Sequence, residues 1–165
     1  QHLIDAFLDF AQTDSEASPP ERLDPVAMVA TIVEDCQRAG QKVTLVYSAG
    51  QGEMAFRPMM LRRAVENLIG NSGRYAQHCK VSVDLTDAML RIRIEDDGPG
   101  IPGERREEAM RPFVRLDPAR NQDKGPGVGL GLAIAADVAR AHGGVLRLGE
   151  SDRLGGLRAD LVIAR

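Results

Sequence analysis

The sequence contains no tryptophan among its 165 residues, and aromatic side chains make up only 4% of it. The interior of the folded chain must therefore be mainly aliphatic, because large aromatic side chains are too few to fill it. Only two cysteines are present, Cys36 and Cys79, and they lack the paired spacing of a metal site. We expect both to be buried or half-buried thiols in a reducing compartment.

The chain also lacks an apolar run of the roughly 18 to 20 residues that a membrane span needs, and it shows no signal peptide. It begins at Gln1 rather than at a methionine, so we interpret it as part of a longer protein, with any membrane anchor outside it. Excess positive charge is absent as well. The net charge of −3 argues against nucleic acid as the main partner.

The N-terminal segment 1–13 carries apolar residues at helical spacing, which indicates a helix that packs against partner helices. A polar stretch ending in two prolines follows at 14–20 and is typical of a linker. We therefore expect the globular domain to occupy residues 21–165.

Hydrophobic periodicity and glycine and proline signals predict four helices and six strands in this domain. The mixture predicts an α+β fold, in which helices cover one face of a sheet. The expected helices are 25–39, 58–75, 104–110 and 130–142, and the expected strands are 42–47, 53–56, 81–85, 90–95, 145–149 and 157–163.

Asn67, Asn71 and Arg74 lie at positions i, i+4 and i+7 of the expected helix 58–75 and so share one of its faces. The apolar residues of this helix fall on another face, so core packing does not explain two asparagines. A side-chain carbonyl can ligate Mg²⁺, which takes few protein ligands when it arrives with phosphates. The other interpretation is an ordinary solvated polar face.

Asp96 and Asp97 end an expected strand and are followed by Gly98, Pro99 and Gly100. A carboxylate held beside a tight turn only accepts hydrogen bonds, and it could accept one from an exocyclic amine such as N6 of adenine. The alternative is an Asp-Gly turn without a ligand.

Two further segments border an irregular stretch. In the first, Phe113 could anchor a mobile loop to which Arg115, Arg120 and Lys124 give positive charge, and a solvated loop is the alternative. In the second, the glycines of 125–132 directly precede a helix and leave room for backbone N–H groups to face an anion. This segment is neither a P-loop nor a dinucleotide motif, and a flexible linker would also explain it.

In this order and spacing, the four segments resemble those of the catalytic, ATP-binding domain of sensor histidine kinases. The segment 67–75 is similar to the N box of that family, 96–100 to its G1 box, 112–115 to its F box and 127–132 to its G2 box. The resemblance covers about residues 20–165 and is closest to the osmosensor branch. Ser72 stands where the family more often has alanine.

The resemblance implies the Bergerat ATP-binding fold, a two-layer α/β sandwich with a mixed, mostly antiparallel sheet and three main helices on one face. It implies ATP and Mg²⁺ as cofactors, with Asp96 accepting from the adenine amine and Asn71 ligating the metal. Residues 114–128 would form a mobile lid. The implied catalytic residues are Asn67, Asn71 and Arg74. The implied nucleotide-binding residues are Asn67, Asn71, Arg74, Tyr75, Asp96, Gly98, Gly100, Ile101, Phe113, Arg115, Lys124, Gly127, Val128, Gly129, Leu130, Gly131 and Leu132.

The implied reaction is transfer of the γ-phosphoryl group of ATP to a histidine on a separate helix hairpin, the protein's own dimerisation domain. A response regulator receiver domain would then take the group onto an aspartate. Residues 1–13 resemble the end of that hairpin, and none of the chain's three histidines has the acceptor context. The parent protein is expected to be a membrane-anchored homodimer with this domain in the bacterial cytoplasm.

ATPases such as gyrase, Hsp90 and MutL share the implied fold, as do some serine kinases, and fold alone does not decide function. Those relatives tend to carry a glutamate four residues before the metal asparagine, where it activates water. Here that position is Asn67, which favours a histidine kinase. A docking module that has lost ATP is the non-enzymatic alternative, and the presence of Asp96, Asn71 and the glycines of 127–131 argues against it.

Overall fold

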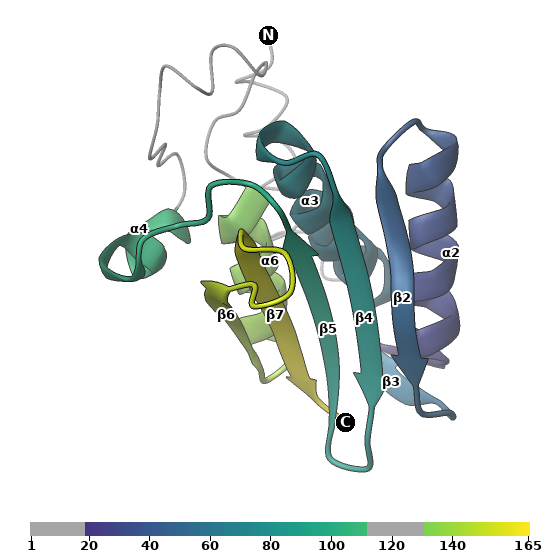
Figure 1. Ribbon diagram of the computed structural model, residues 1–165. Coiled ribbons are helices and arrows are strands. Elements are labelled where there is room, and N and C mark those ends of the chain that lie inside the picture. The colour runs from purple at the N-terminus through teal and green to yellow at the C-terminus, as the bar shows by residue number, and fades with distance from the viewer. Residues whose placement is uncertain (1–18, 112–130) are drawn as a thin grey trace, which may run out of the picture.

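The computed structural model describes residues 19–111 and 131–165, and it has the expected α+β class (Figure 1). The central sheet has five strands in the order β2-β4-β5-β7-β6, in which β2 runs parallel to β4 and the other neighbours are antiparallel. A separate small sheet pairs β1 with β3. The strands are β1 (Glu21–Leu23), β2 (Val43–Ala49), β3 (Met54–Phe56), β4 (Cys79–Leu85), β5 (Met89–Asp96), β6 (Val145–Glu150) and β7 (Leu157–Ala164).

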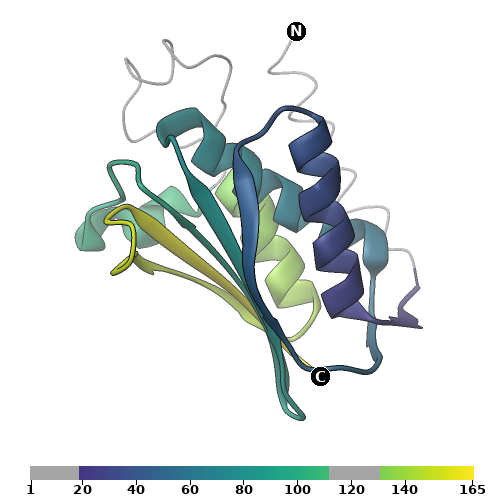
Figure 2. The ribbon, with the colours of Figure 1, turned by 45° about the vertical axis from the view of Figure 1, so that its right-hand side comes forward.

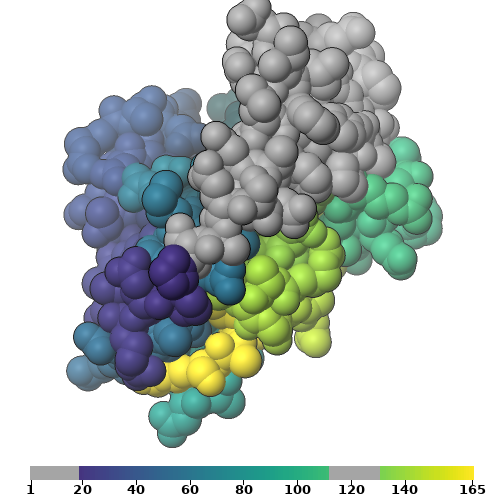
Figure 3. Space-filling model, turned by 180° about the vertical axis from the view of Figure 1, so that it is seen from behind, coloured from purple at the N-terminus to yellow at the C-terminus, as the bar shows by residue number. Residues whose placement is uncertain are grey.

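Three main helices cover one face of the sheet, as predicted (Figure 2): α2 (Pro25–Arg38), α3 (Pro58–Tyr75) and α6 (Gly131–Ala141). Figure 3 shows the molecule from behind, where both α2 and α6 reach the surface. The short turns η1 (Gly103–Arg105) and α4 (Arg106–Ala109) follow β5. Within the described stretches, no helix is long and apolar enough to cross a bilayer.

The start of α2 follows directly from Asp24 and Pro25. The carboxylate of Asp24 accepts hydrogen bonds from the backbone N–H groups of Val26 and Ala27 at 2.9 and 3.1 Å. Pro25 has the φ angle of a helix and needs no partner for a missing N–H group. The predicted helix start is therefore confirmed together with its physical cause.

The core lies between the sheet and the three helices. Alternate residues of β4 and β5 point into it, among them Val81, Val83, Ile92 and Ile94, none of which is more than 2% exposed. Among the described residues, the largest fully buried side chains are Ile, Leu and Met, together with one aromatic residue, Phe56. The expectation of a mainly aliphatic interior is confirmed.

Both cysteines are free and buried, as predicted. Burial raises the pKa of the Cys36 thiol, and it raises that of Cys79 to about 12. Both thiols are therefore protonated at neutral pH and are poor nucleophiles.

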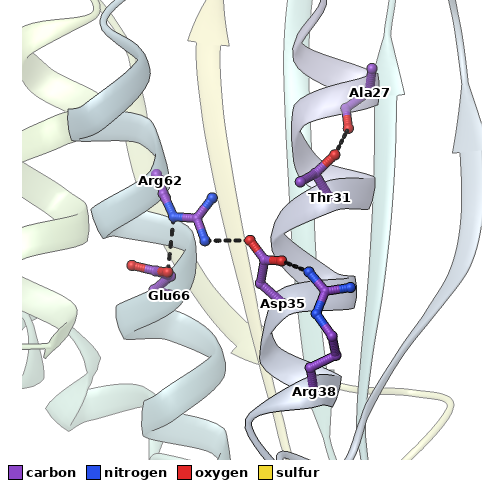
Figure 4. Close-up of polar contacts among 6 residues, drawn as sticks. All are labelled: Ala27, Thr31, Asp35, Arg38, Arg62 and Glu66. Atoms are coloured by element: carbon purple, nitrogen blue, oxygen red, sulfur yellow. Dashed lines mark hydrogen bonds and ion pairs between the residues drawn. The ribbon is translucent and has the colours of Figure 1, made fainter.

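An ion-pair network joins α2 to α3 at the surface (Figure 4). Arg62 of α3 donates to Asp35 of α2 at 2.6 Å and to Glu66 of its own helix at 3.0 Å. Asp35 also pairs with Arg38. The hydrogen bond from Arg62 holds the pKa of Asp35 below its usual range. Such exposed pairs orient neighbouring helices but add little stability.

Candidate functional site

Asp96 is the last residue of β5 and is only 3% exposed. Its Oδ1 accepts hydrogen bonds from the backbone N–H groups of Gly98 and Leu157, both at 3.0 Å. Its Oδ2 accepts one from the hydroxyl of Ser72 at 2.9 Å. A carboxylate offers about four acceptor positions, and the described residues fill three of them. The fourth position, on Oδ2, suits a further donor.

Three consecutive acids at the end of β5 have three different surroundings. Glu95 points to the face of the sheet opposite to Asp96, because strand residues alternate, and it accepts from the Ser151 hydroxyl at 2.8 Å. Asp97 lies beyond the strand and accepts from the ring Nδ1 of His78 at 2.7 Å and from its backbone N–H at 2.9 Å. The ring and backbone of His78 lower the pKa of Asp97 to about 2. Asp96 is therefore the acid that faces α3.

Two glycines allow three segments to meet at Asp96. A Cβ on Gly98 would lie 2.8 Å from the carbonyl oxygen of Tyr75, at the end of α3. A Cβ on Gly156, in the loop between β6 and β7, would overlap Oδ1 of Asp96. A third glycine, Gly100, has a φ angle of +71°, which other residues rarely adopt. The turn after β5 thus depends on glycine for both space and conformation.

The polar face of α3 lies close to the start of α6. Asn67, Asn71 and Arg74 are all half-buried. Asn67 donates its amide N–H to the carbonyl oxygen of Arg63 at 2.8 Å, so its amide oxygen is the atom suited to a cation. A Cβ on Gly131 would lie 3.6 Å from the carbonyl oxygen of Asn67 and 4.0 Å from Cβ of Asn71. Amide side chains and the beginning of a helix therefore share one place, a combination that suits an anion with its metal.

Three other predicted site residues surround this region in different ways. Tyr75 ends α3 beside the Gly98 turn. Ile101 is half-buried against the core, and its carbonyl oxygen accepts from Arg106 at 3.0 Å. Leu132 is 7% exposed and belongs to the hydrophobic core, so it supports the position of α6.

The family model of histidine kinase-, DNA gyrase B- and HSP90-like ATPases matches residues 57–163, which contain all of this geometry. The chain belongs to this family. Among curated relatives, the sensor protein RstB of Escherichia coli (strain K12) is 35% identical over 161 residues, which cover 94% of this chain and 37% of RstB. The chain spans between 22% and 37% of the length of the first curated relatives that it matches.

Solved structures of sensor histidine kinases have the same fold. The histidine kinase domain of the E. coli osmosensor EnvZ is 33% identical, with a TM-score of 0.66 and a coverage of 91% of both chains. The ATP binding domain of PrrB from Mycobacterium tuberculosis is 28% identical, with a TM-score of 0.71 and a coverage of 87% of this chain and 96% of that chain. The resemblance to sensor histidine kinases of the osmosensor branch, and the fold that it implied, are therefore confirmed.

Part of the predicted site falls on residues that the structure does not describe. The expected lid 114–128 and the N-terminal helix 1–13 lie there. The site residues in this group are Phe113, Arg115, Lys124, Gly127, Val128, Gly129 and Leu130. Among the described site residues, Asp96, Gly98 and Tyr75 form one group, and Asn67, Asn71 and Gly131 form another at the same helix.

Sequence reasoning missed two residues that shape the site. Ser72 appeared only as a departure from the family pattern, although it donates to Asp96. It is a polar residue one turn after Leu68 on the apolar stripe of α3, and this position was the available signal. Gly156 lies 60 residues after Asp96 in sequence, and no local pattern connects the two.

Proposed function

We propose that this domain binds Mg²⁺-ATP and donates the γ-phosphoryl group to a histidine on a separate domain of its parent protein. The observation that carries the proposal is the arrangement of three features along the second half of α3. These features are the buried acceptor Asp96, the amide face with Asn67 and Asn71, and the start of α6 at Gly131.

Asp96 would accept a hydrogen bond from the exocyclic amine of adenine. The free acceptor position on Oδ2 supports this role, because an amino group supplies the missing donor. Gly98 and Gly100 would let the base approach the backbone, and Tyr75 and Ile101 would contact it from either side of the turn.

Asn71 would ligate Mg²⁺, with Asn67 and Arg74 assisting the metal or the phosphates. The donor set fits this ion, since Mg²⁺ prefers oxygen ligands and takes most of them from phosphates and water. When bound, Mg²⁺ neutralises charge on the transferred phosphoryl group. The side chains on α3 would then orient the triphosphate, and Phe113, Arg115 and Lys124 would belong to a lid formed by 114–128.

Transfer to a protein side chain is favoured over hydrolysis by the nature of Asn67. An amide cannot take a proton from water as a general base does, and its N–H group is engaged with the carbonyl of Arg63. The acceptor would lie on a helix hairpin, and residues 1–13 would be the end of that hairpin. A response regulator receiver domain would receive the group next, and the parent would be a membrane-anchored homodimer with this domain in the cytoplasm.

The test is a calorimetric titration of the chain with a non-hydrolysable ATP analogue, with and without Mg²⁺, on the wild type and on Asp96→Asn. The variant puts an NH₂ group in place of one carboxylate oxygen, and this group cannot accept from the adenine amine, so we expect affinity to fall roughly 100-fold. Asp84→Asn is the matched control. Asp84 is on β4, its carboxylate pairs with Arg91 of β5 at 3.8 Å, and it lies on the face of the sheet away from the helices. Absence of binding by folded wild type would favour a docking module instead.

Phosphoryl transfer needs a second measurement. We expect labelled phosphate to move from ATP to a separately supplied dimerisation hairpin of the parent protein, and to stay on a histidine. Hydrolysis of ATP without labelling of the hairpin would favour an ATPase.

A further inference from the structure

Ser72 is a hydroxyl placed among core residues. It is 2% exposed and lies on the same stripe of α3 as Ala64 and Leu68, two side chains that pack into the core. The hydroxyl of a serine in the middle of a helix commonly donates a hydrogen bond to the carbonyl oxygen four residues earlier. Here the hydroxyl instead donates to Oδ2 of Asp96 at 2.9 Å. The helix is thereby joined to the end of β5 by a side-chain hydrogen bond.

The two oxygens of Asp96 are held differently. Oδ1 is held by two backbone N–H groups, from Gly98 and Leu157, which no side-chain substitution there removes. Oδ2 has a side-chain donor in Ser72. The orientation of the oxygen that would meet the base therefore depends on one hydroxyl group. Alanine at this position would leave the buried oxygen without that donor, an unfavourable state for a charged acceptor.

We infer that Ser72 is a positioning residue that orients Asp96 toward an amino group of the bound base, and so contributes to the selection of bases that carry such a donor. The inference rests on the proposed function. Ser72 acts through Asp96, so its contribution appears only when the ligand has a donor for Oδ2. A purine with hydrogen in place of the 6-amino group would make no hydrogen bond to Oδ2. Its affinity would therefore not depend on how Ser72 orients Asp96.

The experiment compares two ligands on two proteins by calorimetry. The ligands are ADP and purine riboside diphosphate, which lacks the 6-amino group, and the proteins are the wild type and Ser72→Ala. We expect Ser72→Ala to weaken ADP about tenfold and to change the affinity for the second ligand by less than about twofold. Ser82→Ala is the control, because Ser82 lies on β4 and points away from the helices. Thermal unfolding of each free protein establishes that the variants are folded.

Equal weakening of both ligands by Ser72→Ala would overturn the inference, because it would show a merely structural role. An unchanged affinity for ADP would overturn it as well. If the wild type bound neither ligand, the proposed function would fail and the inference with it. If the wild type bound ADP but Ser72→Ala showed no base-dependent effect, only the inference would fail.

Discussion

Both halves of α3 pack apolar residues into the core, and the second half adds polar contacts at the candidate site. In the first half, 58–66, Leu61, Ala64 and Val65 are completely buried, and Arg62 forms ion pairs at the surface. The second half, 67–75, contains two glycines and the amide face, and its buried hydroxyl, Ser72, is joined to Asp96.

This difference separates stability from chemistry along one helix. Apolar burial contributes free energy without specifying a ligand, whereas polar contacts near the end of the helix place acceptors and donors at exact positions. Substitutions of buried residues in the first half should therefore change the free energy of unfolding, and substitutions of polar residues in the second half should change nucleotide binding.

The largest expected effect is that of Leu61→Ala, in the first half. Leu61 is 0% exposed, so the substitution leaves a cavity in the core, and we expect the free energy of unfolding to fall by about 2–5 kcal/mol. Urea denaturation followed by circular dichroism measures the change. Met59→Ala is the control with little expected effect, because Met59 is 67% exposed. Similar losses for both variants would contradict the comparison.

In the second half, Asn71→Ala should have the opposite profile. We expect the affinity for the ATP analogue with Mg²⁺ to fall by roughly 30-fold, and the stability of the free protein to stay equal or rise slightly, because alanine favours helices. Titrations with and without Mg²⁺ measure the first change, and urea denaturation measures the second. If Asn71→Ala lowered the affinity equally with and without Mg²⁺, Asn71 would not act as a ligand of the metal.

Gly156→Ala disturbs Asp96, the acid that Ser72 contacts, without changing α3. The new Cβ would overlap Oδ1 of Asp96, so we expect nucleotide affinity to fall about tenfold. Gly155→Ala is the matched control, because Gly155 has a φ angle of +85° but no atom within 4 Å of the added Cβ. Strain alone would weaken stability in the control and leave affinity unchanged. Equal affinities in the two variants would argue against this account of Asp96.

A smaller effect concerns pH and the start of α3. The ring of His142 donates from Nδ1 to the carbonyl of Val138 and accepts from the backbone N–H of Arg57 at Nε2, at 3.0 Å. Burial lowers the pKa of His142, so the folded state keeps the ring neutral where the unfolded chain begins to take up a proton.

Stability should therefore be constant above about pH 6.5 and fall as pH drops below it, by at most about 1.4 kcal/mol per unit from this group. Denaturation curves between about pH 5 and about pH 8 measure how the free energy of unfolding changes with pH. His142→Gln should reduce the slope, and an identical slope in the variant would assign it to other groups.

The smallest expected effect is that of the surface pair between α2 and α3. Asp35→Asn and Arg62→Gln should each lower stability only slightly, and high salt should reduce the difference, because both groups are partly exposed to solvent. A double-mutant cycle at low and high salt measures the coupling. A change in nucleotide affinity in these variants would show that residues of the first half of α3 also affect nucleotide binding.

Local patterns were sufficient for most of the fold. The 3.6-residue period identified α2, α3 and α6, and short apolar or alternating runs between turns identified the five strands of the central sheet. The strand β1 was missed because it has three residues, all exposed, without alternation. Pairing with β3 makes it a strand, and this contact comes from elsewhere in the chain.

By itself the sequence determined the aliphatic core, the order of helices and strands, and the four motifs that identify the family. Only the tertiary structure decided that Ser72 and Gly156 meet at Asp96. The physical reason is that a local pattern places a residue on one face of its own helix or strand but does not say which distant segment packs against it. That partner depends on the packing of segments far apart in sequence.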